Sequence, residues 1–493
     1  MTLKQLVVSN KQQILHFDTS VYIMQCILAT SICNSIIGRL RYPARRGSVL
    51  FFALSALPPF AMSLNQFFKL AEHGTNIRTE VVAGVTTFLT MAYIIFVNPA
   101  ILVDAGLPKD AVFVATCLAA ALGTLIMGLY ANYPIGMAPG MGLNAYFAYA
   151  VVLGMGVPWQ TALGAVFISG CLFIIVSVFK VREHIVNGIP QSLRVAITVG
   201  LGLFLALIAM KSAGLVVANP ETLVTVGDMH NPHTLMAVFG FLLIVTLDRL
   251  RVPGALLIGI VAVTVLSFFF GGNTFKGFMS LPPSIAPTLF HFDLAGAISM
   301  GLFNVVLVFF LVELFDATGT LMGVASRAGL LVNGKMERLN KALLADSCAI
   351  VAGSVLGTSS TTAYLESAAG VQAGGRTGLT AVAVALLFLA CLFISPLAAV
   401  VPPYATAPAL LYVACLMLRE LADIDWSDTT ESVPAALAAL TMPFTYSIAL
   451  GVAFGFIAYA VLKLLTGRAR EVKPVVWLIA GAFLFKFATV GAA

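Results

Sequence analysis

The chain has 493 residues, of which 60% are hydrophobic and only 10% are charged, with a formal net charge of +6. Soluble domains carry about 25% charged residues, so this composition excludes a soluble enzyme, a disordered protein and a nucleic-acid-binding protein. Continuous apolar runs of membrane-spanning length recur along almost the whole chain, which excludes an outer-membrane β-barrel and predicts an all-α polytopic membrane protein.

Residues 1–61 differ from the rest of the chain. They contain a basic cluster and two modest apolar runs, 20–37 and 48–61. Two interpretations stay open: an extra N-terminal hairpin or anchor, or a mis-assigned start, with Met62 as the real initiator. We prefer the second, so the transporter itself is expected to occupy residues 62–491.

Apolar segments long enough to cross a bilayer follow in chain order. They lie at about 80–103, 111–131, 134–151, 159–179, 190–211, 234–247, 253–271, 297–325, 341–357, 358–374, 377–400, 405–418, 433–465 and 474–491. With residue 79 in the cytoplasm, most lysines and arginines fall in inner loops, while Lys109, Lys211 and Lys276 fall outside. This balance requires 433–465 to cross twice, broken near Pro443. We therefore predict 14 core spans, with 474–491 as an extra C-terminal helix.

The two halves of the chain share features at a constant offset. A shift of 218 residues places Asn98 on Asp316, Tyr146 on Tyr364, and Pro190 on Pro408. The offset covers seven spans, an odd number, so the two copies would be oppositely oriented. Inverted repeats are typical of secondary transporters, whose substrate site lies at the midplane between the repeats. Coincidence among alanine-rich helices is the alternative.

Two spans are interrupted by residues that helices avoid. Segment 134–147 has two prolines and three glycines, and its counterpart 357–366 is a run of small hydroxyl residues. Non-helical backbone at membrane depth is tolerated only where it lines a cavity or is buried in protein. Each segment precedes helical sequence, so each would aim a helix N-terminus at the bilayer centre. A binding site is the preferred interpretation, and tight packing of small residues is the alternative.

Three carboxylates lie well away from the ends of predicted spans, namely Glu313, Asp316 and Glu366. Intramembrane acids cost about 2.5–3.5 kcal/mol on insertion scales and are functional candidates by default. Glu313 and Asp316 are three residues apart, so they share one face of a helix. Neither span contains a lysine or arginine to neutralise the acids. We therefore expect them to take up and release protons; capping a helix or bonding a hydroxyl is the alternative, most serious for Glu313.

Other acids and absent motifs narrow the function. Asp346, near the start of a span, is expected to cap a helix or act in gating, and the inner-loop acids are expected to be solvated surface. Those loop acids are Asp423, Asp425, Asp428 and Glu431. The chain has no GxxxxGK[ST] loop and no HExxH motif, which argues against ATP hydrolysis and against a membrane metalloenzyme. We expect no metal and no cofactor.

Six segments carry a resemblance to a known family. They begin with NIRTEVVAGVTTFLTMAY (76–93), VNP (97–99) and APGMGLNAYF (138–147), and continue with LFDATGTL (314–321), GTSSTTAYLESAAG (357–370) and GGRTGLTA (374–381). Together they resemble the AzgA-like hypoxanthine/guanine/adenine permeases of the nucleobase:cation symporter and nucleobase:ascorbate transporter superfamily. The resemblance covers about residues 65–491.

The resemblance implies the uracil-permease fold, with 14 transmembrane spans in a 7+7 inverted repeat and short strands in spans 3 and 10. A core domain would come from about 80–180 and 297–400, and a gate domain from about 190–271 and 405–465. In the family, acids on spans 8 and 10 hold the base, which by motif are Asp316 and Glu366. Glu313 is not carried over by a motif and stays a candidate from its position alone.

The sequence therefore predicts proton-coupled uptake of adenine, guanine or hypoxanthine across a bacterial inner membrane, by elevator-like alternating access. Glu366 would accept the ring N–H groups of the base, and Asp316 would help to bind it and carry the proton. Tyr364 would offer a flat face for stacking. Asn98 and Asn144 would tune the polarity of the site or complete its hydrogen bonds.

The sequence argues against two other functions. An anion transporter of the same fold would need a cationic or neutral midplane, whereas this midplane is acidic. An intramembrane enzyme would need a metal-binding acid cluster or a nucleophile–base pair inside a span, and the sequence offers neither. The partners expected are a purine nucleobase, protons and the lipid bilayer, with no nucleic acid. The preferred purine, and whether the chain forms a homodimer, stay open.

Overall fold

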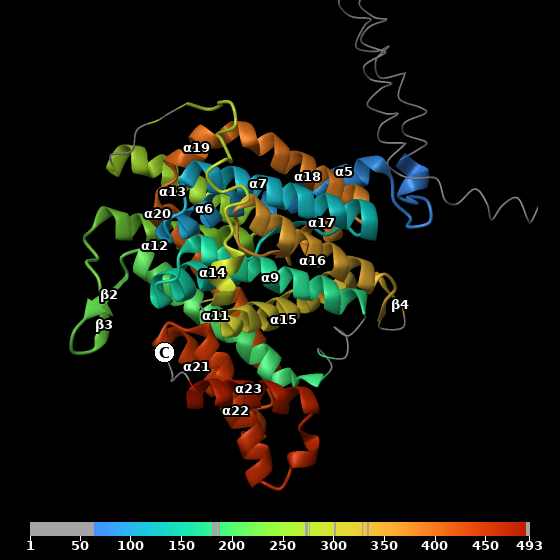
Figure 1. The fold of residues 1–493 in the computed structure, drawn as a ribbon. Coiled ribbons are helices and arrows are strands. Elements are labelled where there is room, and N and C mark those ends of the chain that lie inside the picture. Colours follow the sequence, from blue (N-terminus) through green and yellow to red (C-terminus); the bar gives the residue numbers. More distant parts are fainter. Residues whose placement is uncertain are drawn as a thin grey trace, which may run out of the picture. The chain divides into compact units, whose positions relative to one another are not determined.

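The computed structural model describes residues 64–489, apart from 180–184, 186–187, 272–274, 276, 300–301, 328 and 333–334 (Figure 1). The predicted N-terminal extension, residues 1–61, lies outside the described residues. Leu64 opens the unit that contains every element described below.

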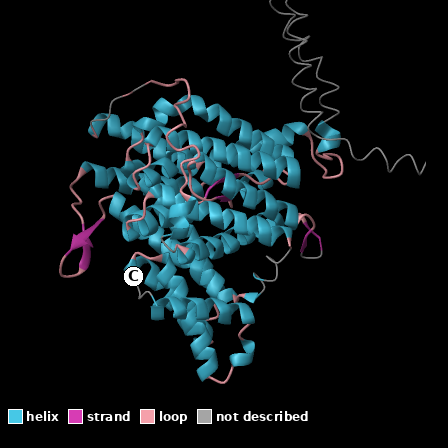
Figure 2. Ribbon diagram, viewed as in Figure 1, coloured by secondary structure: helices cyan, strands magenta, loops and turns pink. Residues whose placement is uncertain are grey.

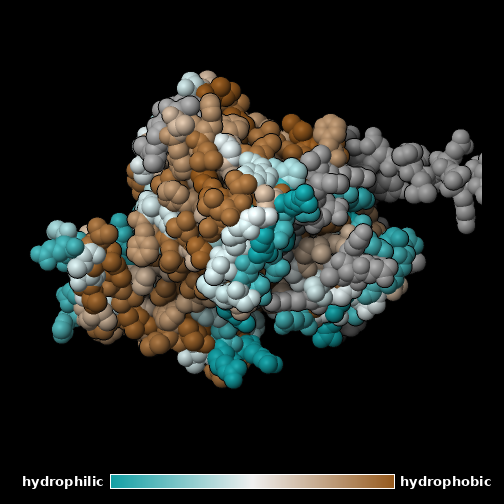
Figure 3. Space-filling model, turned by 90° about the horizontal axis from the view of Figure 1, so that it is seen from below, coloured by the Kyte–Doolittle hydropathy of each residue, from teal (hydrophilic) through white to brown (hydrophobic). Residues whose placement is uncertain are grey.

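Within the described residues, ten helices are long and apolar enough to cross a membrane. They are Ile77–Asp104, Lys109–Ala131, Trp159–Val178, Gln191–Ser212, Pro232–Arg249, Val305–Ser326, Leu339–Leu356, Gly378–Val400, Pro403–Asp423 and Ile448–Leu465. Shorter apolar helices occupy Met141–Gly154, Ala255–Phe270 and Pro474–Phe485. Apolar residues also cover large parts of the surface shown in Figure 3. The prediction of a helical, multi-pass membrane protein is confirmed.

The first half of the chain is helical apart from its connections. It contains α5 (Ile77–Met91), α6 (Ile94–Asp104), α7 (Lys109–Ile126), η1 (Met127–Ala131), α8 (Met141–Ala145), η2 (Tyr146–Gly154), α9 (Trp159–Val178), α11 (Gln191–Ser212), α12 (Pro232–Arg249) and α13 (Ala255–Phe270). Polar residues and prolines set several of the starts. Asn76 caps α5 by accepting a hydrogen bond from the Thr79 backbone N–H at 3.0 Å, and Pro108 and Pro190 directly precede α7 and α11.

The second half follows the same pattern. It contains α14 (Leu294–Ser299), α15 (Phe303–Arg327), α16 (Leu339–Leu356), α17 (Ser367–Gln372), α18 (Gly378–Cys391), η3 (Leu392–Ile394), α19 (Ser395–Val400), α20 (Pro403–Leu418), η4 (Arg419–Asp423), α21 (Thr429–Thr445), α22 (Ile448–Leu465), η5 (Ala469–Glu471) and α23 (Pro474–Thr489). The stretch 433–465 forms two helices, as predicted. The break falls at Tyr446, which has φ +55°, while Pro443 lies within α21.

Short strands occupy both interrupted segments. β1 (Met137–Pro139) pairs antiparallel with β6 (Thr361–Ala363), with Ala138 opposite Thr362. In Figure 2 this pair lies among the helices, whereas the hairpin of β2 (Val216–Asn219) and β3 (Leu223–Val226) projects away from them. A third pair joins β4 (Leu331–Val332) to β5 (Lys335–Met336). The strands that the resemblance implied are therefore present, and they bring the two interrupted segments together.

The first and last motifs of the resemblance are in direct contact, because α5 packs against α17 and α18. Glu80 on α5 is fully buried. Its carboxylate accepts hydrogen bonds from the Arg376 N–H at 2.9 Å, the Thr377 N–H at 3.2 Å and the Thr380 hydroxyl at 2.6 Å. Glu80 also accepts a hydrogen bond at 3.2 Å from the Thr380 N–H, one of the first N–H groups of α18, and so caps this helix from a neighbouring one.

The helices form two packed sets. In one set α11 packs against α20 and α21, with α12, α13 and α22 beside them; in the other, α5, α7, α9, α16 and α18 pack together. α15 packs on α9 of the second set and α8 on α6, and both α15 and α8 contact α11 of the first set, so the two sets meet there. This meeting place is also where the strand pair ends and α8 begins.

Candidate functional site

The β1–β6 pair is held by hydrogen bonds beyond its own ladder. The Gly140 N–H donates to the Ser360 carbonyl at 2.8 Å, and the Tyr364 N–H donates to the Gly136 carbonyl at 3.0 Å. Tyr364, which is 5% exposed, also donates its hydroxyl to the Pro139 carbonyl at 2.6 Å. These contacts fix the point from which α8 begins and keep the Tyr364 ring beside the strand pair.

The hydroxyl run of the second interrupted segment connects four different helices. Thr358 accepts a hydrogen bond from Asn98 of α6 at 2.9 Å, and the Ser359 hydroxyl donates to Asn144 of α8. The remaining pairs are Ser360 donating to Glu313 of α15, and Thr362 donating to Asp346 of α16 at 3.0 Å. Nearly every hydroxyl in the run therefore hydrogen-bonds to a different helix, which explains why the segment is built from serine and threonine.

Asn98 and Asn144 lie in different surroundings. Asn98 is fully buried and also donates to the Thr116 hydroxyl of α7 at 2.7 Å, so it links α6 and α7 to the hydroxyl run. Asn144 lies one turn into α8, equally buried, and its Nδ2 finds no hydrogen-bond partner among the described residues. Asn144 is therefore the member of this pair with donor capacity left for a ligand.

Asp316 lines a cavity between the two sets of helices. The other lining residues come from α8, α11, α15 and α20, and they are Gly142, Leu143, Ile197, Thr198, Leu201, Val312, Phe315 and Met417. The cavity holds about 20 Å³. That is roughly the room of one water molecule. A planar heterocycle the size of a purine is larger than this volume.

Glu366 lies at the start of α17, directly after the strand pair, and is half-buried. Its Oε1 accepts a hydrogen bond from the Tyr93 hydroxyl at 2.6 Å, and its backbone carbonyl lies 3.3 Å from the Thr90 hydroxyl, which has a shorter contact of 2.8 Å to the Thr87 carbonyl. No side chain of the described residues donates to Oε2. The carboxylate therefore has one oxygen engaged and one open.

Glu313 is 1% exposed, one turn before Asp316 on α15. One of its oxygens binds Ser360, and the other has no hydrogen-bond partner among the described residues. Asp346 was expected to cap a helix or act in gating; it caps none, because it lies fully buried in the interior of α16, where it accepts the hydrogen bond from Thr362. No lysine, arginine or histidine of the described residues forms an ion pair with any of the three intramembrane acids.

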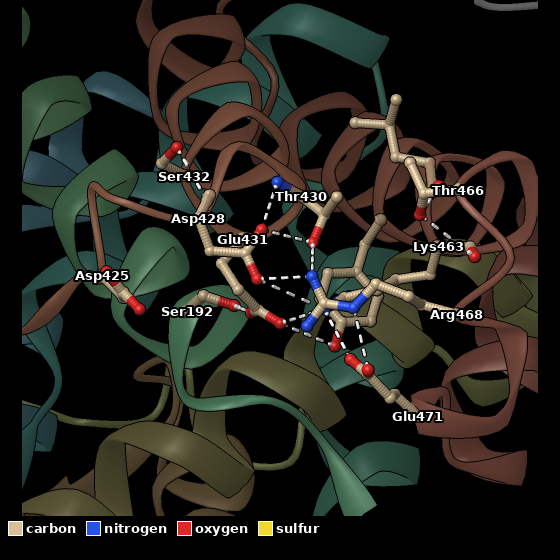
Figure 4. A network of polar contacts seen from close by, with 12 residues as sticks. Ser192, Asp425, Asp428, Thr430, Glu431, Ser432, Lys463, Thr466, Arg468 and Glu471 are labelled. Carbon is tan, nitrogen blue, oxygen red and sulfur yellow. Dashed lines mark hydrogen bonds and ion pairs between the residues drawn. The ribbon is translucent and has the colours of Figure 1, made fainter.

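A second polar cluster, away from this cavity, corrects one expectation (Figure 4). Lys463 is 1% exposed and contacts Glu431 at 2.8 Å and Glu471 at 2.9 Å, while Arg468 binds Asp428 at 2.7 Å. Asp428 and Glu431 were expected to be solvated; their side chains are instead only 24% and 22% exposed and form these ion pairs, whereas Asp423 and Asp425 are exposed as expected. The spacing of the acids gave no sign of the buried lysine, which lies on the following helix.

Two residues of the site had escaped the sequence argument. Tyr93 and Thr90 are ordinary members of an apolar stretch, and nothing near them in the sequence indicates a partner at position 366. The signal available was their place in the longest matching motif, 76–93, midway through a span. Among the described residues, no group of three or more His, Cys, Asp or Glu side chains could hold a metal ion.

Comparison with known proteins gives consistent matches. Residues 78–466 match the model of a permease family. The chain is 50% identical over 430 residues to the adenine permease AdeP of Escherichia coli K12, which covers 87% of this chain and 97% of the relative. It is 48% identical over 427 residues to the guanine/hypoxanthine permease PbuO of Bacillus subtilis 168, which covers 85% and 99%. Among solved structures, the transmembrane domain of the cyanobacterial bicarbonate transporter BicA matches with a TM-score of 0.57 at 18% identity, over 78% of this chain and 97% of the other.

Proposed function

The chain belongs to the permease family, and from this premise we propose that it takes up purine nucleobases across the plasma membrane together with protons. The relatives named as adenine permeases and as guanine/hypoxanthine permeases match almost equally well, at 50% and 48% identity. The substrate class proposed is therefore adenine, guanine or hypoxanthine, without a choice among them.

The observation that carries this proposal is the pair of acids beside the strand pair. A purine base is flat, carries N–H donors on its rings, and carries nitrogen or oxygen acceptors on its edges. The Asp316 carboxylate and the start of α8, which line the cavity, offer an acceptor and backbone donors; Glu366 Oε2 and Asn144 Nδ2 offer a further acceptor and donor but do not line the cavity as it stands. The Tyr364 ring adds a surface for stacking. This combination suits a neutral heterocycle better than an anion, for which an acidic cavity is unfavourable.

Alternating access is the mechanism that this arrangement supports. We place the core domain at about 80–180 and 297–400 and the gate domain at about 190–271 and 405–465, within 14 spans that form two inverted sevens. The cavity of about 20 Å³ lies where these domains meet, too small for a purine, so transport requires them to move against each other. An elevator-like displacement of the core, with the strand pair and Glu366 on it, would carry the base across the gate.

Protons would enter through the same acids. Asp316, Glu313 and Glu366 form no ion pair with a basic side chain of the described residues, and burying several unpaired charges together is costly. Gain and loss of protons there would follow the binding and release of the base. Asp316 is the member that faces the cavity and can respond directly to a ligand.

The test is uptake of radiolabelled adenine, guanine and hypoxanthine by cells that lack their own purine permeases, with and without a protonophore. We expect at least one base to accumulate and the protonophore to abolish the accumulation. Glu366→Gln and Asp316→Asn should each reduce uptake at least ten-fold, while Asp425→Asn in the exposed inner loop should not. Near wild-type uptake by both site variants would reject the assignment of these acids, and no uptake of any base by the wild type would reject the substrate class.

A further inference from the structure

We propose that Tyr93 is a positioning residue for Glu366, and that its hydroxyl holds the carboxylate in the orientation that receives the substrate. This inference rests on the proposed function and deepens it. Tyr93 and Glu366 lie in different halves of the chain. The hydroxyl of Tyr93 nevertheless donates to Glu366 Oε1 at 2.6 Å, within the distance range of hydrogen bonds to a carboxylate.

The position of Tyr93 makes this hydrogen bond persistent. The tyrosine lies where α5 ends and α6 begins, and it is 1% exposed. A fully enclosed aromatic ring has no room to change rotamer, so its hydroxyl stays at one place. Glu366 is only half-buried, which leaves its side chain free to reorient unless another group holds it. Tyr93 is the group that does so.

The backbone beneath Glu366 is held by the same helix. The Thr90 hydroxyl, three residues before Tyr93, lies 3.3 Å from the Glu366 carbonyl oxygen, and its shortest contact is 2.8 Å to the Thr87 carbonyl of its own helix. Thr90 lies in the last turn of α5 and Tyr93 two residues after its end, so both contacts to Glu366 come from the end of α5. α5 also approaches α17 very closely, since a Cβ atom placed on Gly370 would lie 2.5 Å from the Ala83 carbonyl oxygen. The main chain and the carboxylate of Glu366 are therefore both fixed relative to α5.

The consequence concerns substrate affinity. A glutamate side chain has several rotatable bonds, and restricting them at the moment of binding costs free energy. With Oε1 already bound to Tyr93, that cost has been met before the base arrives, and Oε2 points its lone pairs to one place. Removing the hydroxyl should weaken binding while leaving the moving parts of the transporter intact. The expected signature is a higher KM with an unchanged maximal rate.

The experiment compares Tyr93→Phe with Tyr133→Phe in initial-rate uptake by cells, with the amount of protein in the membrane measured for each. Tyr133 is a matched control because it is also 1% exposed, and its hydroxyl accepts a hydrogen bond from the Arg338 N–H instead of donating to a carboxylate. We expect Tyr93→Phe to raise KM about ten-fold, equivalent to about 1.4 kcal/mol, with the maximal rate retained. Tyr133→Phe should leave KM within two-fold of wild type.

A double-mutant cycle separates positioning from general damage. Glu366→Asp withdraws the carboxylate by one methylene, out of reach of the Tyr93 hydroxyl. Adding Tyr93→Phe to Glu366→Asp should then have no further effect on KM. This comparison remains a valid test of the proposal even if Tyr93→Phe by itself lowers the amount of protein in the membrane. Independent, multiplying effects would overturn the proposal, as would a KM for Tyr93→Phe within two-fold of wild type. Failure of the proposed function is distinguishable, because there the wild type itself takes up no purine.

Discussion

Replacing Gly370 by alanine tests how closely α5 holds the region of Glu366. A Cβ atom at this position would lie 2.0 Å from the Thr87 hydroxyl oxygen and 2.5 Å from the Ala83 carbonyl oxygen. The threonine can rotate away, but the carbonyl belongs to the backbone and cannot. Because non-bonded carbon contacts lie near 3.5 Å, α5 and α17 must separate by roughly 1 Å. Such overpacking costs about 1–3 kcal/mol of stability.

The same displacement reaches the site. Adding roughly 1 Å to the 2.6 Å between the Tyr93 hydroxyl and Glu366 Oε1 would give roughly 3.6 Å, which is beyond hydrogen-bonding distance. We therefore expect Gly370→Ala to lower the melting temperature of the detergent-purified protein and to raise the KM for uptake, in the manner of Tyr93→Phe.

Gly481→Ala is the matched control for this variant. Gly481 lies within α23, and a Cβ atom there would have no atom within 4 Å. Alanine favours a helix over glycine by up to about 1 kcal/mol, so this variant should be as stable as the wild type or slightly more stable. If Gly370→Ala melted and transported like Gly481→Ala, the close packing of α5 on α17 would be refuted, and with it the argument that fixes Glu366.

Two further predictions concern the parts of the fold that hold the helices in place. Glu80→Gln keeps one acceptor oxygen but turns an amide group toward the N–H groups at and just before the start of α18. It should lower the stability of the purified protein by about 1–3 kcal/mol relative to Glu72→Gln, which changes an exposed side chain. Equal melting temperatures for the two variants would contradict the role of Glu80. Hydrogen bonds from the Thr430 hydroxyl and from Arg468 hold the pKa of the Asp428 carboxyl well below its ordinary value. The ionised carboxylate therefore stabilises the fold above about pH 4, and this stabilisation is lost as the pH falls through the lowered pKa. Melting of the wild type and Asp428→Asn should thus differ by a constant amount from pH 5 to 8 and converge below pH 4; a difference that grew on acidification would contradict this.

The sequence predicted the interruptions of the two spans but not their partners. Prolines and glycines in 134–147 and hydroxyl residues in 357–366 are incompatible with ordinary spans, and the structure has strands in both. What no local pattern contains is the distribution of Thr358, Ser360 and Thr362 among α6, α15 and α16. Those pairings depend on how the helices pack. Two of them join residues far apart in the chain, and only the pair of Thr362 and Asp346 joins elements that follow each other in the sequence.

The same limit explains the acid residues. Glu313, Asp316 and Glu366 could be singled out because a charge inside an apolar span is unusual at the level of composition. Tyr93 could not, because a tyrosine in a span is unremarkable until its hydroxyl is found against a carboxylate. For Glu431 the prediction erred in the opposite sense, because a residue expected to be solvated is part of a buried ion pair. Its partner, the amine of Lys463, comes from the next helix.

Transport by the purified protein in lipid vesicles tests the central claim most directly. Vesicles with an alkaline interior would be given labelled adenine, guanine or hypoxanthine outside, with Glu366→Gln vesicles and vesicles without a pH gradient beside them. The account predicts that a purine accumulates above its outside concentration only in wild-type vesicles with the gradient. Accumulation that ignored the gradient, or that survived in Glu366→Gln vesicles, would contradict it.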